Sequence, residues 1–224
     1  MPGIPPLILA AKAIPNSLTA QRLLPLSLGL IQGLIHKGIK VVSYACDGTE
    51  TERSAQKLLV QKANFRYTYR IKHPISGYDD IVITIATIYG QLIVMIQDSN
   101  HGLKTRNNLH TGAKVLTLGN HMAMYLYNRM AAFEKGCPVY HRDVEKTNRQ
   151  DDYAAIHTHS GSYIAYITKF HPDKLGQIIY LFINGELIDA YQNRKIPHTE
   201  CIKMVLRAKF FYQMWKSLQI SSTS

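Results

Sequence analysis

Acidic residues are scarce in this sequence of 224 residues. It carries 15 Asp and Glu against 26 Lys and Arg, a formal net charge of +11, and its first acidic residue is Asp47. A disordered basic tail is excluded, because 46% of the residues are hydrophobic and only 18% are charged. The surplus positive charge therefore lies on a folded surface, where it favours polyanions such as nucleic acid or an anionic membrane face.

Cysteines and long apolar runs are also few. The three scattered cysteines, Cys46, Cys137 and Cys201, are too few for a disulfide framework or a paired zinc site, and they predict a reducing compartment. The uncharged stretch 81–96 is shorter than the ~20 residues that a membrane-spanning helix needs, so we expect no membrane segment. The P-loop and the Gly-x-Ser-x-Gly elbow do not occur either, which disfavours P-loop enzymes and serine hydrolases.

The first 110 residues alternate between strand and helix patterns. Thr49 and Glu52 have the spacing of a capping box, which predicts a helix start directly after a strand. Between residues 64 and 73 the chain is polar, aromatic and basic, with Arg66, Arg70 and Lys72, and we expect a strand or a loop there. The other expected elements are strand 6–13, helix 19–38, strand 39–45, helix 49–61, strands 81–88 and 92–97, and a helix that opens at residue 98.

Helical periodicity dominates the second half of the chain. The expected helices cover residues 120–133, 150–170, 175–193 and 198–218. The sequence therefore predicts an α/β fold, with a partial mixed sheet in residues 1–110 and a mainly helical segment in residues 111–224.

Two acidic residues, Asp47 and Asp98, stand at the carboxyl ends of predicted strands. Ligand chemistry collects at such strand ends in open α/β sheets. Carboxylates that converge there can bind Mg²⁺, and a pair of metal ions can promote phosphoryl displacement. The alternative is that both acids only cap the helices that follow them.

Three cations follow Asp98 in the sequence. His101 and Lys104 are three residues apart and share one face of the predicted helix, whereas Arg106 points elsewhere. Cations beside strand-end acids suit a phosphate backbone, so His101, Lys104 and Arg106 are candidate nucleic-acid contacts. The alternative is a solvated helix face that balances the charge of Asp98.

The order of these features resembles the ribonuclease H-like core of P-element and THAP-type DNA transposases. The resemblance is carried by Cys46-Asp47-Gly48 at the end of a strand and by Asp98-x-x-His101-x-x-Lys104, which is followed by Arg106-Asn107-Asn108. It covers roughly residues 5–110 and implies a partial ribonuclease H-like sheet. The family's metal-bound Asp-Asp-Glu set activates water or a 3′ hydroxyl to attack a DNA phosphate.

The resemblance also implies that the catalytic set is incomplete. Asp47 matches the second acid of the family, but no acidic residue precedes it where the first acid should stand. The third acid is expected beyond Ser224, and Glu186 is the best substitute within the chain. We therefore expect a catalytically inactive, transposase-derived fragment that binds DNA without sequence preference.

Other interpretations stay open at this point. In one, Asp47, Asp98 and Glu186 bind Mg²⁺ and the protein is an active DNA nuclease or strand transferase. In others, it is a domesticated nucleic-acid-binding regulatory module or a relic without a selected activity. The transposase resemblance implies a nuclear location, and the incomplete core predicts a homo-oligomer or a full-length transposase as partner.

Overall fold

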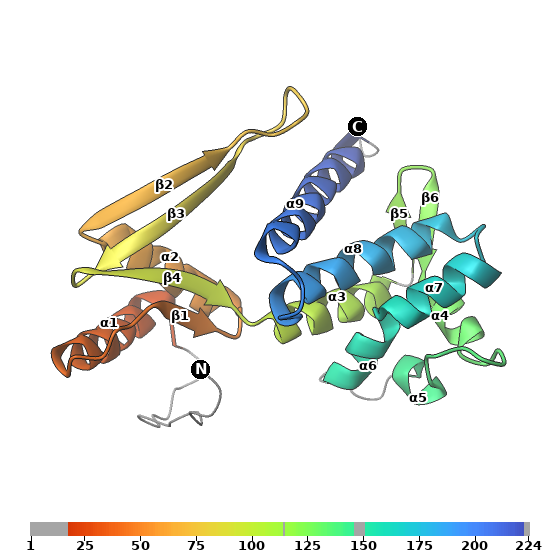
Figure 1. Cartoon of the computed structure of the whole chain (residues 1–224), viewed down its shortest axis with the longest axis horizontal. Coiled ribbons are helices and arrows are strands. Elements are labelled where there is room, and N and C mark those ends of the chain that lie inside the picture. The colour runs from red at the N-terminus through yellow and green to blue at the C-terminus, as the bar shows by residue number, and fades with distance from the viewer. Residues whose placement is uncertain (1–17, 114, 146–150, 222–224) are drawn as a thin grey trace. The chain divides into compact units, whose positions relative to one another are not determined.

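The computed structural model describes residues 18–113, 115–145 and 151–221. These residues form two compact units (Figure 1). The first contains the residues up to 70 together with 82–96, and the second contains 71–81 and the chain from 97 onward.

The first unit is a mixed four-stranded sheet with two helices. Its elements are α1 (Ala20–His36), β1 (Ser43–Cys46), α2 (Glu50–Lys62), β2 (Phe65–Ile71), β3 (Ile81–Ile88) and β4 (Gln91–Gln97), with strand order β1-β4-β3-β2. β3 and β4 form an antiparallel hairpin in which Ala86 faces Ile93, and its turn holds Tyr89 and Gly90 at positive φ. β1 is the neighbour of β4, and the backbone N–H of Val94 donates to the carbonyl of Val42 at 3.0 Å.

The core of this unit lies between the helices and one face of the sheet. Ile31 of α1 and Leu59 of α2 pack with Ala86 and Ile93, which are fully buried neighbours in the hairpin. Because side chains alternate between the two faces of a strand, Leu92 and its same-face neighbours on β4 point to the other face, where they are exposed. One face of the sheet is therefore the core, and the other carries exposed apolar side chains.

The second unit is mainly helical and is organised around a central helix. Its elements are α3 (Ser99–Ala113), β5 (Val115–Leu118), β6 (His121–Met124), α4 (Tyr125–Ala131), α5 (His141–Val144), α6 (Asp152–Thr158), α7 (Gly161–Phe170), α8 (Leu175–Gln192) and α9 (His198–Ser221). α8 contacts α3, α7, α9 and β6. Its glycines Gly176 and Gly185 let the backbones of Met122 and His159 approach the helix closely.

A buried polar network lies inside this helical core. The hydroxyl of Tyr163 and the amide nitrogen of Gln177 both donate to Oδ1 of Asn128, at 2.9 and 2.7 Å. All three side chains are shielded from solvent. Burial raises the pKa of Tyr163, which keeps its hydroxyl protonated as a donor.

Most of the expected elements are confirmed. The coarse prediction of an α/β chain with a mixed sheet and a helical C-terminal segment is correct. The capping box is present as well, because the Thr49 side chain accepts from the backbone N–H of Glu52 at 3.3 Å and Glu52 accepts in return from that of Thr49 at 3.1 Å. The strand expected at 6–13 lies outside the described residues.

Three details of the prediction are wrong. β1 is shorter than the expected strand 39–45. The helix expected at 120–133 begins only at Tyr125, because residues 115–124 form the short hairpin β5–β6 around a Gly119-Asn120 turn. Strands of four residues give only a weak sequence signal. The helix expected at 150–170 is two helices, because the hydroxyl of Ser160 accepts from the backbone N–H of Tyr163 and starts α7 anew.

Candidate nucleic-acid interface

Asp47 lies exposed in the turn between β1 and α2. Gly48 follows it with φ +87°, and Thr49 then caps α2. Burial raises the pKa of the adjacent Cys46 thiol, so Cys46 does not offer a thiolate at neutral pH. Asp47 is thus an exposed acidic residue at this end of β1.

Asp98 stands between β4 and α3 and accepts hydrogen bonds from the start of that helix. Its carboxylate oxygens receive the backbone N–H groups of Asn100 at 3.0 Å and His101 at 3.4 Å. These are the bonds of a helix cap, which was the alternative reading of this residue. Asp47 belongs to the first unit and Asp98 to the second, and their convergence on one Mg²⁺ stays a prediction.

Glu186 lies on α8 and forms an ion pair with Arg207 of α9. The bond joins two packed helices of the second unit. The charge of Glu186 is therefore largely compensated by Arg207. Among residues 18–113, 115–145 and 151–221, no group of three or more His, Cys, Asp or Glu side chains is arranged to hold a metal ion.

Two of the three predicted phosphate contacts on α3 are occupied by contacts within the second unit. Nζ of Lys104 lies 3.2 Å from Oδ1 of Asp152, and its side chain is only 17% exposed. The guanidinium of Arg106 lies 4.5 Å above the ring of Tyr212. His101 is partly exposed. The charge of Lys104 is thus already paired with that of Asp152.

β2 carries an exposed row of aromatic and basic side chains. Phe65, Tyr67 and Tyr69 share one face of the strand and are 56%, 46% and 57% exposed. The rings of Phe65 and Tyr67 are 4.8 Å apart in an edge-to-face arrangement. Arg66 and Arg70 point to the other face and are exposed as well. β2 is an edge strand of the sheet, and an exposed apolar edge strand is prone to aggregate unless it binds a partner.

Arg66 and Arg70 were recognisable in the sequence of this segment, but the row of aromatic rings was not predicted. The signal was present, because Phe-Arg-Tyr-Thr-Tyr-Arg alternates aromatic and polar residues with the period of a strand. Exposed rings on a sheet can stack on nucleobases, and adjacent arginines can contact phosphates. The aromatic–arginine strand, Phe65–Arg70, is therefore the candidate interface in the first unit.

A second basic and aromatic surface lies in the helical unit. A shallow hollow of about 500 Å³ is bordered by Tyr78 and by the α9 residues Lys209, Tyr212 and Lys216. Lys209 and Lys216 are seven residues apart and lie on the same side of α9. Arg106 adds a third cation through its contact with Tyr212. This hollow, called the α9 groove below, combines basic and aromatic side chains as the aromatic–arginine strand does. Arg106, a nucleic-acid candidate from the sequence, reaches it through Tyr212.

The chain matches none of the protein-family models, curated proteins or solved structures with which it was compared. The resemblance to transposases therefore rests on the motifs around Asp47 and Asp98. No helix in the described ranges is both long and apolar enough to span a bilayer.

Proposed function

We propose that this protein is a transposase-derived, ribonuclease H-like fragment that binds single-stranded or locally opened DNA without cutting it. The observation that carries the proposal is the exposed aromatic–arginine strand of β2. Stacking on Phe65, Tyr67 and Tyr69 tolerates any base, and contacts from Arg66 and Arg70 to phosphates carry no sequence information. The net charge of +11 adds a long-range attraction to the same ligand.

The proposed absence of cleavage follows from the contacts that the candidate catalytic acids make within the protein. The carboxylate of Asp98 accepts the backbone N–H groups of α3, and Glu186 is paired with Arg207. Two-metal catalysis needs several ligands fixed around the metal ions, which these roles do not supply. A nuclear location and a full-length transposase or a second copy as partner belong to the same proposal.

The binding test compares one double variant with a control variant by fluorescence anisotropy on a labelled DNA strand of about 20 nucleotides. Tyr67→Ala/Tyr69→Ala should weaken binding at least tenfold, since stacking contributes roughly 1–3 kcal/mol per base. Tyr153→Ala, which removes a ring that is 75% exposed on α6, should leave affinity unchanged. Equal losses in both variants would refute the role of β2.

Salt dependence tests the arginines separately from the rings. Arg66→Gln/Arg70→Gln should reduce the slope of log affinity against log salt by about 1.4, because each phosphate contact on a single strand contributes about 0.7. The control Arg129→Gln/Arg142→Gln removes the same charge from exposed positions in the helical unit. If both pairs change the slope equally, only net charge matters and the proposed interface is wrong.

Cleavage is tested with supercoiled DNA and Mg²⁺ or Mn²⁺. We expect no nicking by the unmodified protein at concentrations that saturate binding. Metal-dependent nicking that Asp47→Ala abolishes would show that the protein is an active nuclease. Retained nicking in Asp47→Ala would point to a contaminating enzyme and would leave the binding results to decide the proposal.

A further inference from the structure

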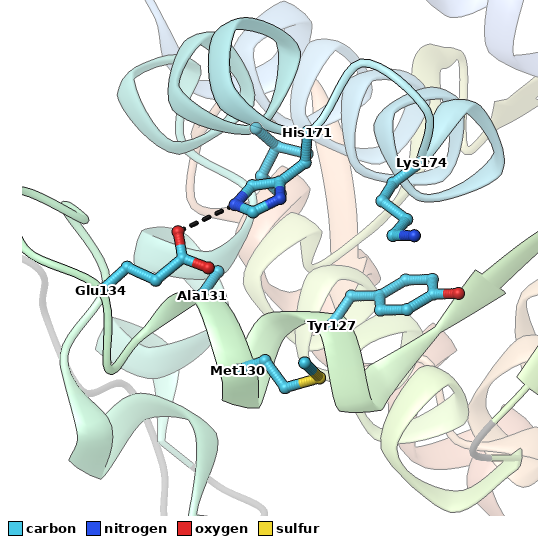
Figure 2. A pocket seen from close by; sticks show the side chains of 7 residues that line it. Tyr127, Met130, Ala131, Glu134, His171 and Lys174 are labelled. Carbon is cyan, nitrogen blue, oxygen red and sulfur yellow. Dashed lines mark hydrogen bonds and ion pairs between the residues drawn. The ribbon is translucent and has the colours of Figure 1, made fainter.

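A small hollow in the helical unit lies apart from the α9 groove and the acids discussed above. It has a volume of about 120 Å³ and is enclosed by α4, α7 and the segment that leads into α8 (Figure 2). Met130, Ala131 and Ile167 supply apolar walls, and Tyr127 supplies an aromatic one. The hollow is too small for a nucleotide or another drug-sized ligand, which need roughly 300 Å³ or more.

The one carboxylate in the wall is already occupied. Oε2 of Glu134 accepts a hydrogen bond from the hydroxyl of Tyr166 at 2.7 Å and another from Nε2 of His171 at 2.8 Å. These two bonds, of which the one from His171 has the larger effect, hold the pKa of Glu134 below its usual value, so its carboxyl group is ionised. Because its charge is satisfied by two protein donors, Glu134 does not make the hollow a cation site.

Lys174 is the cationic group in the wall. Its Nζ lies 4.7 Å from the centre of the Tyr127 ring, on the side of the hollow that Figure 2 shows opposite Glu134. Lys174 is also the N-cap residue of α8, an 18-residue helix whose N-terminal dipole adds positive potential there. Its partner is Asp173, at 2.6 Å, whose side chain is 66% exposed. Exposed pairs of this kind contribute little, so a ligand can replace Asp173 at small cost.

The ring of His171 forms another wall of the hollow. Its Nε2 lies 2.8 Å from Oε2 of the ionised Glu134 and donates to it, which leaves the other ring nitrogen as an acceptor. The other ring nitrogen is turned away from Glu134, toward the side on which Lys174 and Tyr127 lie (Figure 2). A ligand held by Lys174 thus meets a polar ring atom on one side and apolar side chains on the other.

We propose that this hollow binds a small organic carboxylate with a short apolar or aromatic body. The carboxylate pairs with Nζ of Lys174, and the body lies among Tyr127, Met130 and Ile167, against the ring of His171. A molecule the size of butyrate or benzoate matches the volume. This site is independent of the proposed DNA binding, because it shares no residue with the aromatic–arginine strand or the α9 groove.

The test is a titration of the full chain, labelled with ¹⁵N, followed by NMR. Benzoate should shift the backbone amides of residues 171–174 with a dissociation constant on the order of 1 mM, the value expected for so few ligand atoms. Benzyl alcohol and benzylamine have the same body without the carboxylate and should bind at least tenfold more weakly. Absence of shifts at about 20 mM benzoate, or equal binding of the alcohol, would overturn the proposal.

Two variants with opposite expected effects make the test specific. Lys174→Met should weaken benzoate binding about tenfold, the effect of one lost charge-assisted bond, whereas Asp173→Asn should strengthen it severalfold because it frees Lys174. The control Lys169→Met removes a neighbouring exposed lysine that does not line the hollow. Equal effects of Lys169→Met and Lys174→Met would refute the site. If Lys174→Met fails to fold, Asp173→Asn still tests the proposal, because Asp173 is exposed. Weaker or unchanged benzoate binding by Asp173→Asn would contradict the proposal.

Discussion

The packing of α8 can be tested at a single position, Gly185. A Cβ at this residue would stand 2.5 Å from the backbone carbonyl oxygen of His159 and 3.5 Å from Cδ1 of Ile164. The first distance is far inside contact, and a backbone carbonyl cannot rotate away as a side chain can. Gly185→Ala must therefore push α8 away from the turn between α6 and α7.

The magnitude follows from two opposed effects. Ala in place of Gly in a helix interior stabilises by about 1 kcal/mol, whereas overpacking of a core costs about 1–3 kcal/mol. Since the clash is with backbone, we take the upper part of that range and expect a net loss of about 1–2 kcal/mol in the free energy of unfolding. Gly102→Ala on α3 is the matched control, because a Cβ there meets nothing within 4 Å, and it should stabilise by up to about 1 kcal/mol.

The assay is equilibrium unfolding in urea followed by tryptophan fluorescence. The single tryptophan of the sequence, Trp215, lies on α9 and donates its Nε1–H to the carbonyl of Thr117 at 2.6 Å, so it reports on the helical unit. Circular dichroism in parallel shows whether the two units unfold together. If Gly185→Ala is as stabilising as Gly102→Ala, α8 does not approach His159 as described and the reasoning is wrong.

Three further predictions concern hydrogen bonds in the helical unit. The hydrogen bond to Glu134 raises the pKa of Tyr166 to about 12, so in Glu134→Gln ultraviolet titration should find it closer to 10. The pKa of Glu134 itself is lowered, so ionised Glu134 stabilises the fold above its usual pKa of 4.5, and this stabilisation is lost as the pH falls through the lowered pKa. In Glu134→Gln this part of the pH dependence of unfolding should vanish. An unchanged loss of stability at acidic pH would contradict the prediction. Asn128→Leu leaves the buried donors of Tyr163 and Gln177 without their shared acceptor and should cost about 2–4 kcal/mol in urea unfolding, whereas a loss below about 1 kcal/mol would show that the network is not formed.

Elements with strong local signals could be predicted from the sequence. The capping box of Thr49 and Glu52 starts α2 as expected, because it depends on bonds between residues three apart. The turn at Tyr89 and Gly90 places β3 and β4 correctly for the same reason. The break between α6 and α7 was missed, although Ser160 is a good cap, because the apolar period continues across it.

The surroundings of the candidate site residues could not be predicted in this way. Lys104 finds Asp152 and Glu186 finds Arg207 through the packing of helices, and nothing in the spacing of these pairs marks them as partners. Arg106 likewise rests on Tyr212, which is more than a hundred residues away in the sequence. Charge counting identifies which side chains could bind phosphate, but only tertiary contacts show which of them are already paired within the protein.

This difference shifts the interpretation of the basic charge from α3 to β2. A cation that is ion-paired and mostly buried, as Lys104 is, must lose a partner before it binds a phosphate, and that exchange gains little. The arginines of β2 are exposed on one face of this edge strand and its aromatic rings are exposed on the other, so both kinds of side chain are accessible to a DNA strand. The motif that suggests a transposase and the surface that best suits DNA are therefore different parts of the chain, and binding by β2 does not require that Asp47 or Asp98 retain any catalytic role.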